Sequence, residues 1–331
     1  MANDTTYRLK VQPLKDYRPA PYDAVQSVVA GEYVSIRHMQ NDVKTHVRRL
    51  NATQYQVIQT GAIKEYQPMD ADKARASKRA AVSRTMEELR ALIRANFNGV
   101  NSPQQLMVTL TYREHMTDPA KMKRNFQTYS QQLSRHFPGH QLEYIAVAEP
   151  HGTGRWHMHV LLKTDRPHIY ISPEQSAKLW PHGFSTVRRL KGDDAGAYYA
   201  VYFTTLLYEV NDPENASETS EEILKNEEDI LAAWAEMTDE SVEETKAHMK
   251  SSRLHFYPKG MRLYRCSQGI TRPEKTSHWY RDIEEGPYER IFETACSVSK
   301  VYEEDSKEHG AGEMEELNKI YRATYRRKRR K

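Results

Sequence analysis

The most regular pattern of hydrophobic and polar positions lies between about residues 104 and 207. Leu106–Tyr112 (LMVTLTY) alternates with a period of two, which predicts a half-buried strand. Asp118-Pro119 is typical of a helix start and Pro138-Gly139 of a helix end, so a helix is predicted between them. The same reasoning predicts strands over 142–149, 156–163 and 184–190, and helices over 172–180 and 193–207.

This order, β-α-β-β-α-β with a further helix, predicts a ferredoxin-like split βαβ fold of the α+β class. Such a fold has an antiparallel sheet with helices packed on one face, and we expect the other face to be free for a ligand. Two later extended runs, Leu254–Pro258 and Met261–Cys266, could add strands to the sheet.

The regular region defines three parts of the chain. Residues 1–100 are expected to form a basic N-terminal extension, irregular through Pro13, Pro19 and Pro21 and helical from about 70 to 96. Residues 101–273 are expected to form the catalytic domain, with an acidic helical insertion at 209–250. Residues 274–331 are a C-terminal extension, and its basic tail Tyr321–Lys331 has seven Lys or Arg among eleven residues.

Charge is distributed unevenly along the chain. The net charge is +4, but residues 209–250 hold 14 Asp or Glu and 3 Lys, a net of −11, which leaves +15 on the remainder. A basic body with one acidic segment favours a nucleic-acid-binding protein, although helix faces in contact with solvent explain part of the charge equally well. The acidic segment fits either recruitment of a protein partner or occupation of a basic groove.

The sequence shows no sign of membrane insertion or export. No apolar stretch approaches the length of a membrane span, and Met1–Lys10 has no signal-peptide core. Cys266 and Cys296 fit neither a metal-ligand spacing nor a disulfide framework. We therefore expect a cytoplasmic protein with no membrane partner.

Two histidines mark a candidate metal site. His157 and His159 lie two residues apart on a predicted strand, so both side chains point to the same face. Two converging imidazoles favour a divalent cation, and Glu149 at the end of the preceding strand is the expected third ligand, with His151 as the reserve. The alternative is a pair of half-exposed strand histidines that bind no metal.

Two tyrosines are candidate nucleophiles. Tyr198 and Tyr202 are four residues apart on the predicted last helix, so they share one helical face. A phenolate can attack a phosphodiester and hold it as a phosphotyrosine, and two tyrosines can do so in succession. The alternative is an aromatic stripe that packs in the core.

In combination these blocks resemble the HUH-endonuclease superfamily, in particular the rolling-circle replication initiators of plasmids and phages. MVTLTY (107–112) is similar to its first motif, GRWHMHVLL (154–162) to its metal motif, and AYYAVYFTT (197–205) to its tyrosine helix. GMRLYRCSQGITRP (260–273) is similar to the stretch that follows that helix in phage-type initiators.

The resemblance implies metal-dependent nicking and joining of single-stranded or hairpin origin DNA. Glu149, His157 and His159 would hold Mg²⁺ or Mn²⁺, and Tyr198 would be the first nucleophile, Tyr202 the second and Tyr199 a less favoured choice. Phage-type relatives carry lysines three residues after each of the two tyrosines, where this chain has Val201 and Thr205. Another cation would have to substitute, and the expected DNA-binding residues are Thr109, Thr111, Arg188, Arg189 and Lys191.

The chain has no G-x-x-x-x-G-K-[ST] phosphate loop, so a host helicase would unwind the DNA and a host polymerase would extend it. A conjugative relaxase or a single-strand transposase would use the same centre. Outside the superfamily, the alternatives are a non-catalytic, RNA-recognition-like binding module and a degenerate initiator that binds an origin without cleaving it. Threonines and histidines, not stacking aromatics, on the predicted central strands argue against the binding module.

Overall fold

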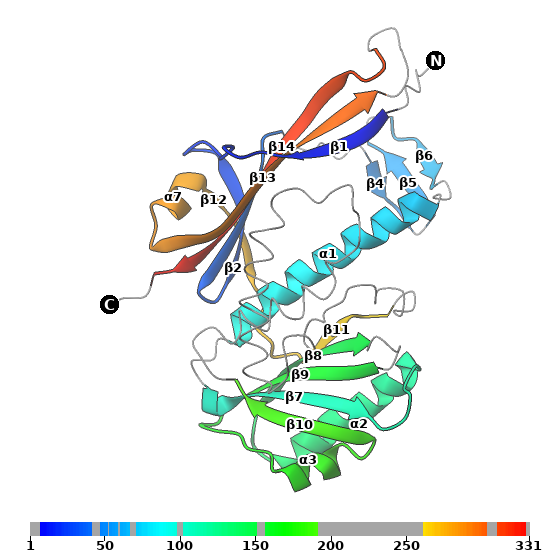
Figure 1. Ribbon diagram of the computed structural model, residues 1–331, viewed down its shortest axis with the longest axis vertical. Coiled ribbons are helices and arrows are strands. Elements are labelled where there is room, and N and C mark those ends of the chain that lie inside the picture. The colour runs from blue at the N-terminus through cyan, green and yellow to red at the C-terminus, as the bar shows by residue number, and fades with distance from the viewer. Residues whose placement is uncertain are drawn as a thin grey trace. The chain divides into compact units, whose positions relative to one another are not determined.

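The structure is a computed structural model that describes residues 7–41, 47–51, 53–58, 60–66, 71–97, 102–150, 156–190, 261–302 and 310–328. The chain divides into two compact units (Figure 1). Unit 1 comprises Met1–Ala80 and Glu274–Lys331, and unit 2 comprises Ala81–Pro273. The acidic insertion expected at 209–250 and the predicted helix at 193–207 lie outside the described residues.

Unit 2 is built on a five-stranded antiparallel sheet with the strand order β10-β7-β9-β8-β11. Its first four strands and their two helices follow one another as β7-α2-β8-β9-α3-β10, so the predicted α+β, ferredoxin-like arrangement is confirmed. The extra strand expected within Met261–Cys266 is present as β11. The elements are β7 (Gln105–Tyr112), α2 (Pro119–His136), β8 (Leu142–Pro150), β9 (Trp156–Thr164), α3 (Pro173–Leu179), β10 (Gly183–Arg189) and β11 (Tyr264–Cys266), with a short 3-10 turn at Ser102–Gln104.

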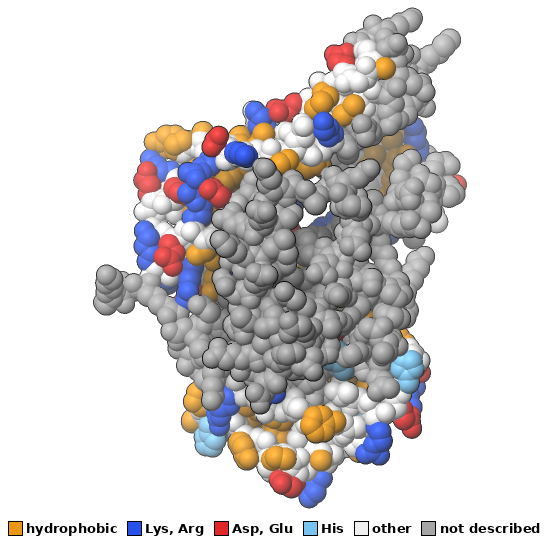
Figure 2. All heavy atoms as spheres, viewed as in Figure 1, with side chains coloured by type: hydrophobic (Ala, Val, Ile, Leu, Met, Phe, Trp, Pro, Cys, Tyr) orange, Lys and Arg blue, Asp and Glu red, His pale blue; other side chains and the backbone are white. Residues whose placement is uncertain are grey.

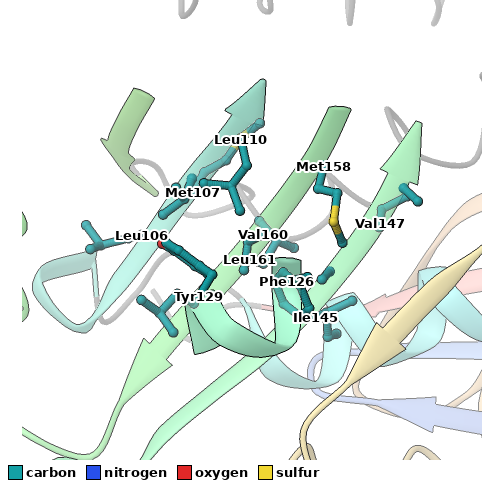
Figure 3. Packing of buried hydrophobic residues seen from close by; sticks show 14 of the residues in the cluster. Leu106, Met107, Leu110, Phe126, Tyr129, Ile145, Val147, Met158, Val160 and Leu161 are labelled. Atoms are coloured by element: carbon teal, nitrogen blue, oxygen red, sulfur yellow. The ribbon is translucent and has the colours of Figure 1, made fainter. Parts of the chain in front are cut away.

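One face of this sheet packs against α2 and α3. Asp118 caps α2 by accepting hydrogen bonds from two backbone N–H groups, and Ser172 forms a capping box with Gln175 at the start of α3. Phe126 and Tyr129 of α2 pack under the sheet near Val160 (Figure 3), and the Phe126 ring lies 5.1 Å from that of Tyr144. Burial of this apolar face holds the sheet and helices together.

The opposite face, expected to be free, is partly covered. The second half of α1 (Ala71–Asn96) contributes Met86, Leu89 and Ile93 to the same core cluster. The Lys163 ammonium donates to the Asn96 side-chain oxygen at 2.7 Å, and Lys163 lies on the same face of β9 as His157 and His159. The long helix therefore covers the end of this face that is remote from His157, because its apolar side needs a partner.

Unit 1 contains a six-stranded antiparallel sheet with the order β1-β13-β14-β3-β2-β12. Residues 7–39 therefore form strands, in contrast to the irregular extension expected. Pro13 ends β1, and Pro19 and Pro21 lie in the connection to β2, so the prolines separate strands. The strands are β1 (Tyr7–Pro13), β2 (Ala24–Ala30), β3 (Tyr33–Met39), β12 (Glu274–Trp279), β13 (Tyr288–Tyr302) and β14 (Met314–Arg327).

Part of the basic tail also belongs to this sheet. Tyr321–Arg327, expected not to fold alone, is the end of β14 and pairs with both β3 and β13. Tyr321 and Tyr325 are buried against Tyr280 and Ile283 of α7 (Tyr280–Glu284). A small separate sheet consists of β4 (Val47–Arg49), β5 (Gln54–Val57) and β6 (Ile63–Glu65).

Among the described residues, no helix is long and apolar enough to cross a membrane. The described surface in Figure 2 shows side chains of both charge signs interspersed with hydrophobic ones.

Candidate metal centre

The strand register brings the three predicted ligands to one point on the sheet. β8 and β9 are antiparallel, and Glu149 is directly opposite His157. Residues directly opposite each other in such a pair point to the same face, and His159, two residues along β9, points there as well. The three side chains therefore meet on the face that α2 and α3 do not cover.

The ligand atoms of this triad are mutually adjacent. Glu149 Oε2 lies 3.1 Å from His159 Nε2 and 3.5 Å from His157 Nε2. The two Nε2 atoms are 3.0 Å apart, and the imidazole planes are inclined at 84°. Within the described residues this is the group of His, Cys, Asp and Glu side chains whose geometry could hold a metal ion.

The donor set fits a divalent cation. Ligand atoms about 2.1 Å from a cation lie about 3.0 Å apart at right angles and about 3.4 Å apart at the tetrahedral angle. The observed separations of 3.0, 3.1 and 3.5 Å fall close to these values. Because all three ligands are neighbours, they occupy one side of a coordination sphere and leave the other side open to water or substrate oxygens.

Thr109 supports His159 from the neighbouring strand. β7 pairs with β9 so that Thr109 is directly opposite His159, and the Thr109 Oγ1 to His159 Nδ1 distance is 3.2 Å. When Nδ1–H donates to the hydroxyl, the Nε2 lone pair points into the triad. Such a hydrogen bond fixes the tautomer and the orientation of a metal-binding imidazole.

The triad lies almost out of contact with solvent. Exposure of the side chains is 5% for Glu149, 6% for His159 and 14% for His157. Burial raises the pKa of Glu149, but hydrogen bonds and positive charge from His157 and His159 outweigh burial and hold that pKa well below its usual range. A buried carboxylate needs a compensating positive charge, which imidazolium or a bound cation can supply.

The same register reveals an exposed aromatic residue that the sequence analysis missed. Glu149, His157, Thr111 and Phe184 are directly opposite one another in turn across β8, β9, β7 and β10. Phe184 is 69% exposed on the face that carries the triad. The sequence predicted its strand, but the pairing of β10 with β7 could not be read from the residues.

Two buried contacts fix the position of β10 in this row. The Trp180 indole N–H donates to the Thr111 carbonyl at 3.0 Å, which ties the end of α3 to β7. A Cβ at Gly183 would collide with the backbone carbonyl of Thr111, so only glycine allows the strands to approach this closely.

The structure separates the two predicted arginines. Arg188 is directly opposite Met107, on the face of the triad, and is exposed. Arg189 points to the other face, where its guanidinium donates to the Pro103 carbonyl at 3.1 Å. The remaining predicted residues lie outside the described part of the chain: Lys191, His151, Tyr198, Tyr199 and Tyr202.

The fold and the triad together define an α+β protein with a candidate divalent-metal centre on an antiparallel sheet. A family model for replication-associated proteins of the ORF2 type matches residues 105–207. This range begins with β7, contains the triad and includes the stretch with Tyr198 and Tyr202. The match supports a replication initiator. No curated protein and no solved structure gives a significant match.

Proposed function

We propose that the chain is a metal-dependent nickase that starts rolling-circle replication by cutting and joining single-stranded DNA, as the resemblance to HUH endonucleases implies. The single observation that carries the proposal is the convergence of Glu149, His157 and His159 on the open sheet face. The replication-associated family match over the same residues supports it.

The chemistry is a transesterification. The phenolic oxygen of Tyr198 attacks the scissile phosphorus and forms a phosphotyrosine, and the bond from phosphorus to the 3′ oxygen breaks. The 3′ oxygen takes up a proton and becomes the 3′-OH that primes synthesis, while the 5′ fragment stays on the protein. Tyr202 resolves the product by a second transfer. A cation held by the triad supplies polarisation of the scissile phosphate when it is bound.

The donor set favours Mn²⁺ over Mg²⁺. Mg²⁺ prefers carboxylate, phosphate and water oxygens, whereas imidazole nitrogens favour transition metals. Two of the three ligand atoms in the triad are imidazole nitrogens. We therefore expect Mn²⁺ to bind more tightly than Mg²⁺ at equal concentration.

Phe184 and Arg188 extend the proposed site across β10. An exposed phenylalanine in register with the triad offers a stacking surface for an unpaired base next to the scissile phosphate. Exposed Arg188 lies on the same face two rows away, where it can contact the DNA backbone. These features favour single-stranded or hairpin-extruded origin DNA, with a host helicase and polymerase as partners.

A covalent-adduct assay tests the proposal. Labelled single-stranded origin DNA is incubated with Mn²⁺ or with chelator, and the protein-linked label is resolved by denaturing electrophoresis. We expect an adduct in Mn²⁺ that is lost in chelator and lost in Tyr198→Phe, with Tyr202→Phe deficient in joining.

The same assay distinguishes the alternatives. An adduct that needs Tyr202 but not Tyr198 would keep the nickase and reverse the order of the nucleophiles. Binding of the origin with no adduct under any divalent cation would overturn the nickase in favour of an origin-binding protein that does not cleave.

A further inference from the structure

The six-stranded sheet of unit 1 has one apolar face and one face that is exposed and basic. In β3, Val34 and Ile36 are buried while Arg37 is exposed, and in β14 Tyr321 and Ala323 are buried while Arg322 is exposed. The buried set packs with α7. Strand alternation therefore places Arg37 and Arg322 on the face opposite the core.

The register collects further polar and cationic residues on that face. Ser277, Gln26, Arg37, Arg322 and Thr294 lie directly opposite one another in turn across β12, β2, β3, β14 and β13. The next row begins with Lys275 and ends with Phe292. We call this surface the basic face and define it by Gln26, Lys275, Trp279, Arg37, Arg322 and Phe292.

The charge of the basic face is complementary to a polyanion. Arg37 is directly opposite Arg322 on adjacent strands, and like charges in that position repel. In the described rows from Lys275 to Arg326, the acidic residue on this face is Glu289, directly opposite Arg326. A phosphate bound between the two arginines would relieve the repulsion and use planar guanidinium groups for recognition.

The exposed aromatic side chains narrow the choice of polyanion. Trp279 is 51% exposed and Phe292 is 45% exposed, on strands at two sides of the arginine pair. Four strand spacings of about 4.8 Å separate β12 from β13, so the basic face extends over about 19 Å. Cations interleaved with exposed aromatic rings are the surface on which unpaired bases stack while the backbone is neutralised.

We propose that the basic face is a second nucleic-acid-binding surface, which holds single-stranded DNA without sequence preference and without a metal ion. This inference goes beyond the proposed nicking reaction, because none of its residues belongs to the metal centre. Single strands are favoured over duplex because paired bases leave no ring face for Trp279 and Phe292 to stack on.

Fluorescence anisotropy of the full chain with a labelled oligo(dT) of about 30 nucleotides, in chelator, tests the proposal. The first variant is Arg37→Gln/Arg322→Gln, which removes charge from exposed positions. We expect its affinity to fall about tenfold and the slope of log affinity against log salt to become shallower by about 1.4, the value for two lost phosphate contacts. Trp279→Ala, a separate change at an exposed position, should weaken binding about tenfold with an unchanged salt slope.

A matched control is Lys10→Gln/Arg327→Gln, which removes two exposed charges from the opposite side of the same sheet. It should bind like the wild type. Equal affinities and equal salt slopes for the arginine variant, the control and the wild type would overturn the proposal. Loss of duplex binding with retention of oligo(dT) binding would also overturn it, since it would assign the surface to paired DNA.

Discussion

The two large sheets of this protein share an antiparallel architecture and differ in where they place their polar residues. In unit 2, Glu149 and His159 are buried, and each ligand is contributed by one residue at one register position. In unit 1, Arg37, Arg322 and Trp279 are exposed and distributed over several strands. A centre for chemistry therefore depends on every member, whereas a binding surface spreads its free energy over many contacts.

This difference predicts how each region responds to substitution. Removal of one ligand from a buried triad leaves the other two without a partner, so the loss is large and close to complete. Removal of one exposed cation loses a single phosphate contact, so the loss is graded. The following predictions test that contrast, from the largest expected effect to the smallest.

The largest effect is expected from His159→Ala. It removes a ligand atom that lies 3.1 Å from the Glu149 carboxylate, so adduct formation in Mn²⁺ should fall more than about 100-fold. The measurement is the initial rate of adduct formation with single-stranded origin DNA. His168→Ala, which removes an exposed histidine, should leave the rate unchanged. Equal rates for the two variants would remove the triad from the reaction.

A smaller loss is expected from Thr109→Val, which keeps the shape of the side chain and removes the hydroxyl next to His159 Nδ1. Loss of such a supporting hydrogen bond typically lowers metal affinity by about 10- to 100-fold. Titration calorimetry with Mn²⁺ measures it. Thr111→Val, on the same strand and the same face, should change the affinity much less. A larger loss in Thr111→Val would contradict the assigned role of Thr109.

Phe184→Ala should weaken binding of single-stranded origin DNA by about tenfold, because one base loses its stacking partner. Phe184→Trp should restore the affinity, since it keeps an aromatic surface. Tyr170→Ala is the matched control, because Tyr170 is 62% exposed and lies outside the row that contains the triad. Anisotropy with short origin oligonucleotides measures all three variants. No loss in Phe184→Ala would show that bases do not stack there.

The smallest effect concerns the cap of α2. Hydrogen bonds from the backbone N–H groups of Lys121 and Ala120 lower the pKa of Asp118 below its ordinary value of 3.8. A group whose pKa is depressed in the folded state stabilises the fold above its unfolded pKa, and the stabilisation disappears as pH falls through the folded value. Thermal unfolding should show wild type losing its small advantage over Asp118→Asn as pH falls below about 4. A constant difference across this range would contradict the charged cap.

The elements of unit 2 could be predicted because their strands and helices follow one another along the chain. The alternation of Leu106–Tyr112 and the capping residues Asp118 and Ser172 are local signals, and they mark the observed elements closely. The pairing of Glu149 with His157 also follows from two consecutive strands joined by one short turn.

The sheet of unit 1 could not be predicted in the same way. β1 pairs with β13, so Val11 is directly opposite Val298, and no local pattern identifies a partner so distant in sequence. The exposed position of Phe184 beside Thr111 depends on the register of β10 with β7, which the sequence does not specify. Long-range pairing and register are properties of the assembled sheet.

The central claim is that Glu149, His157 and His159 form one metal-binding centre. Electron paramagnetic resonance of Mn²⁺ titrated into the full chain, in the absence of DNA, tests it most directly, because free Mn²⁺ and protein-bound Mn²⁺ give different signals. We predict one tightly bound Mn²⁺ per wild-type chain and none at the same concentration in Glu149→Gln. Equal binding by wild type and Glu149→Gln, or no tight binding by wild type, would contradict the claim.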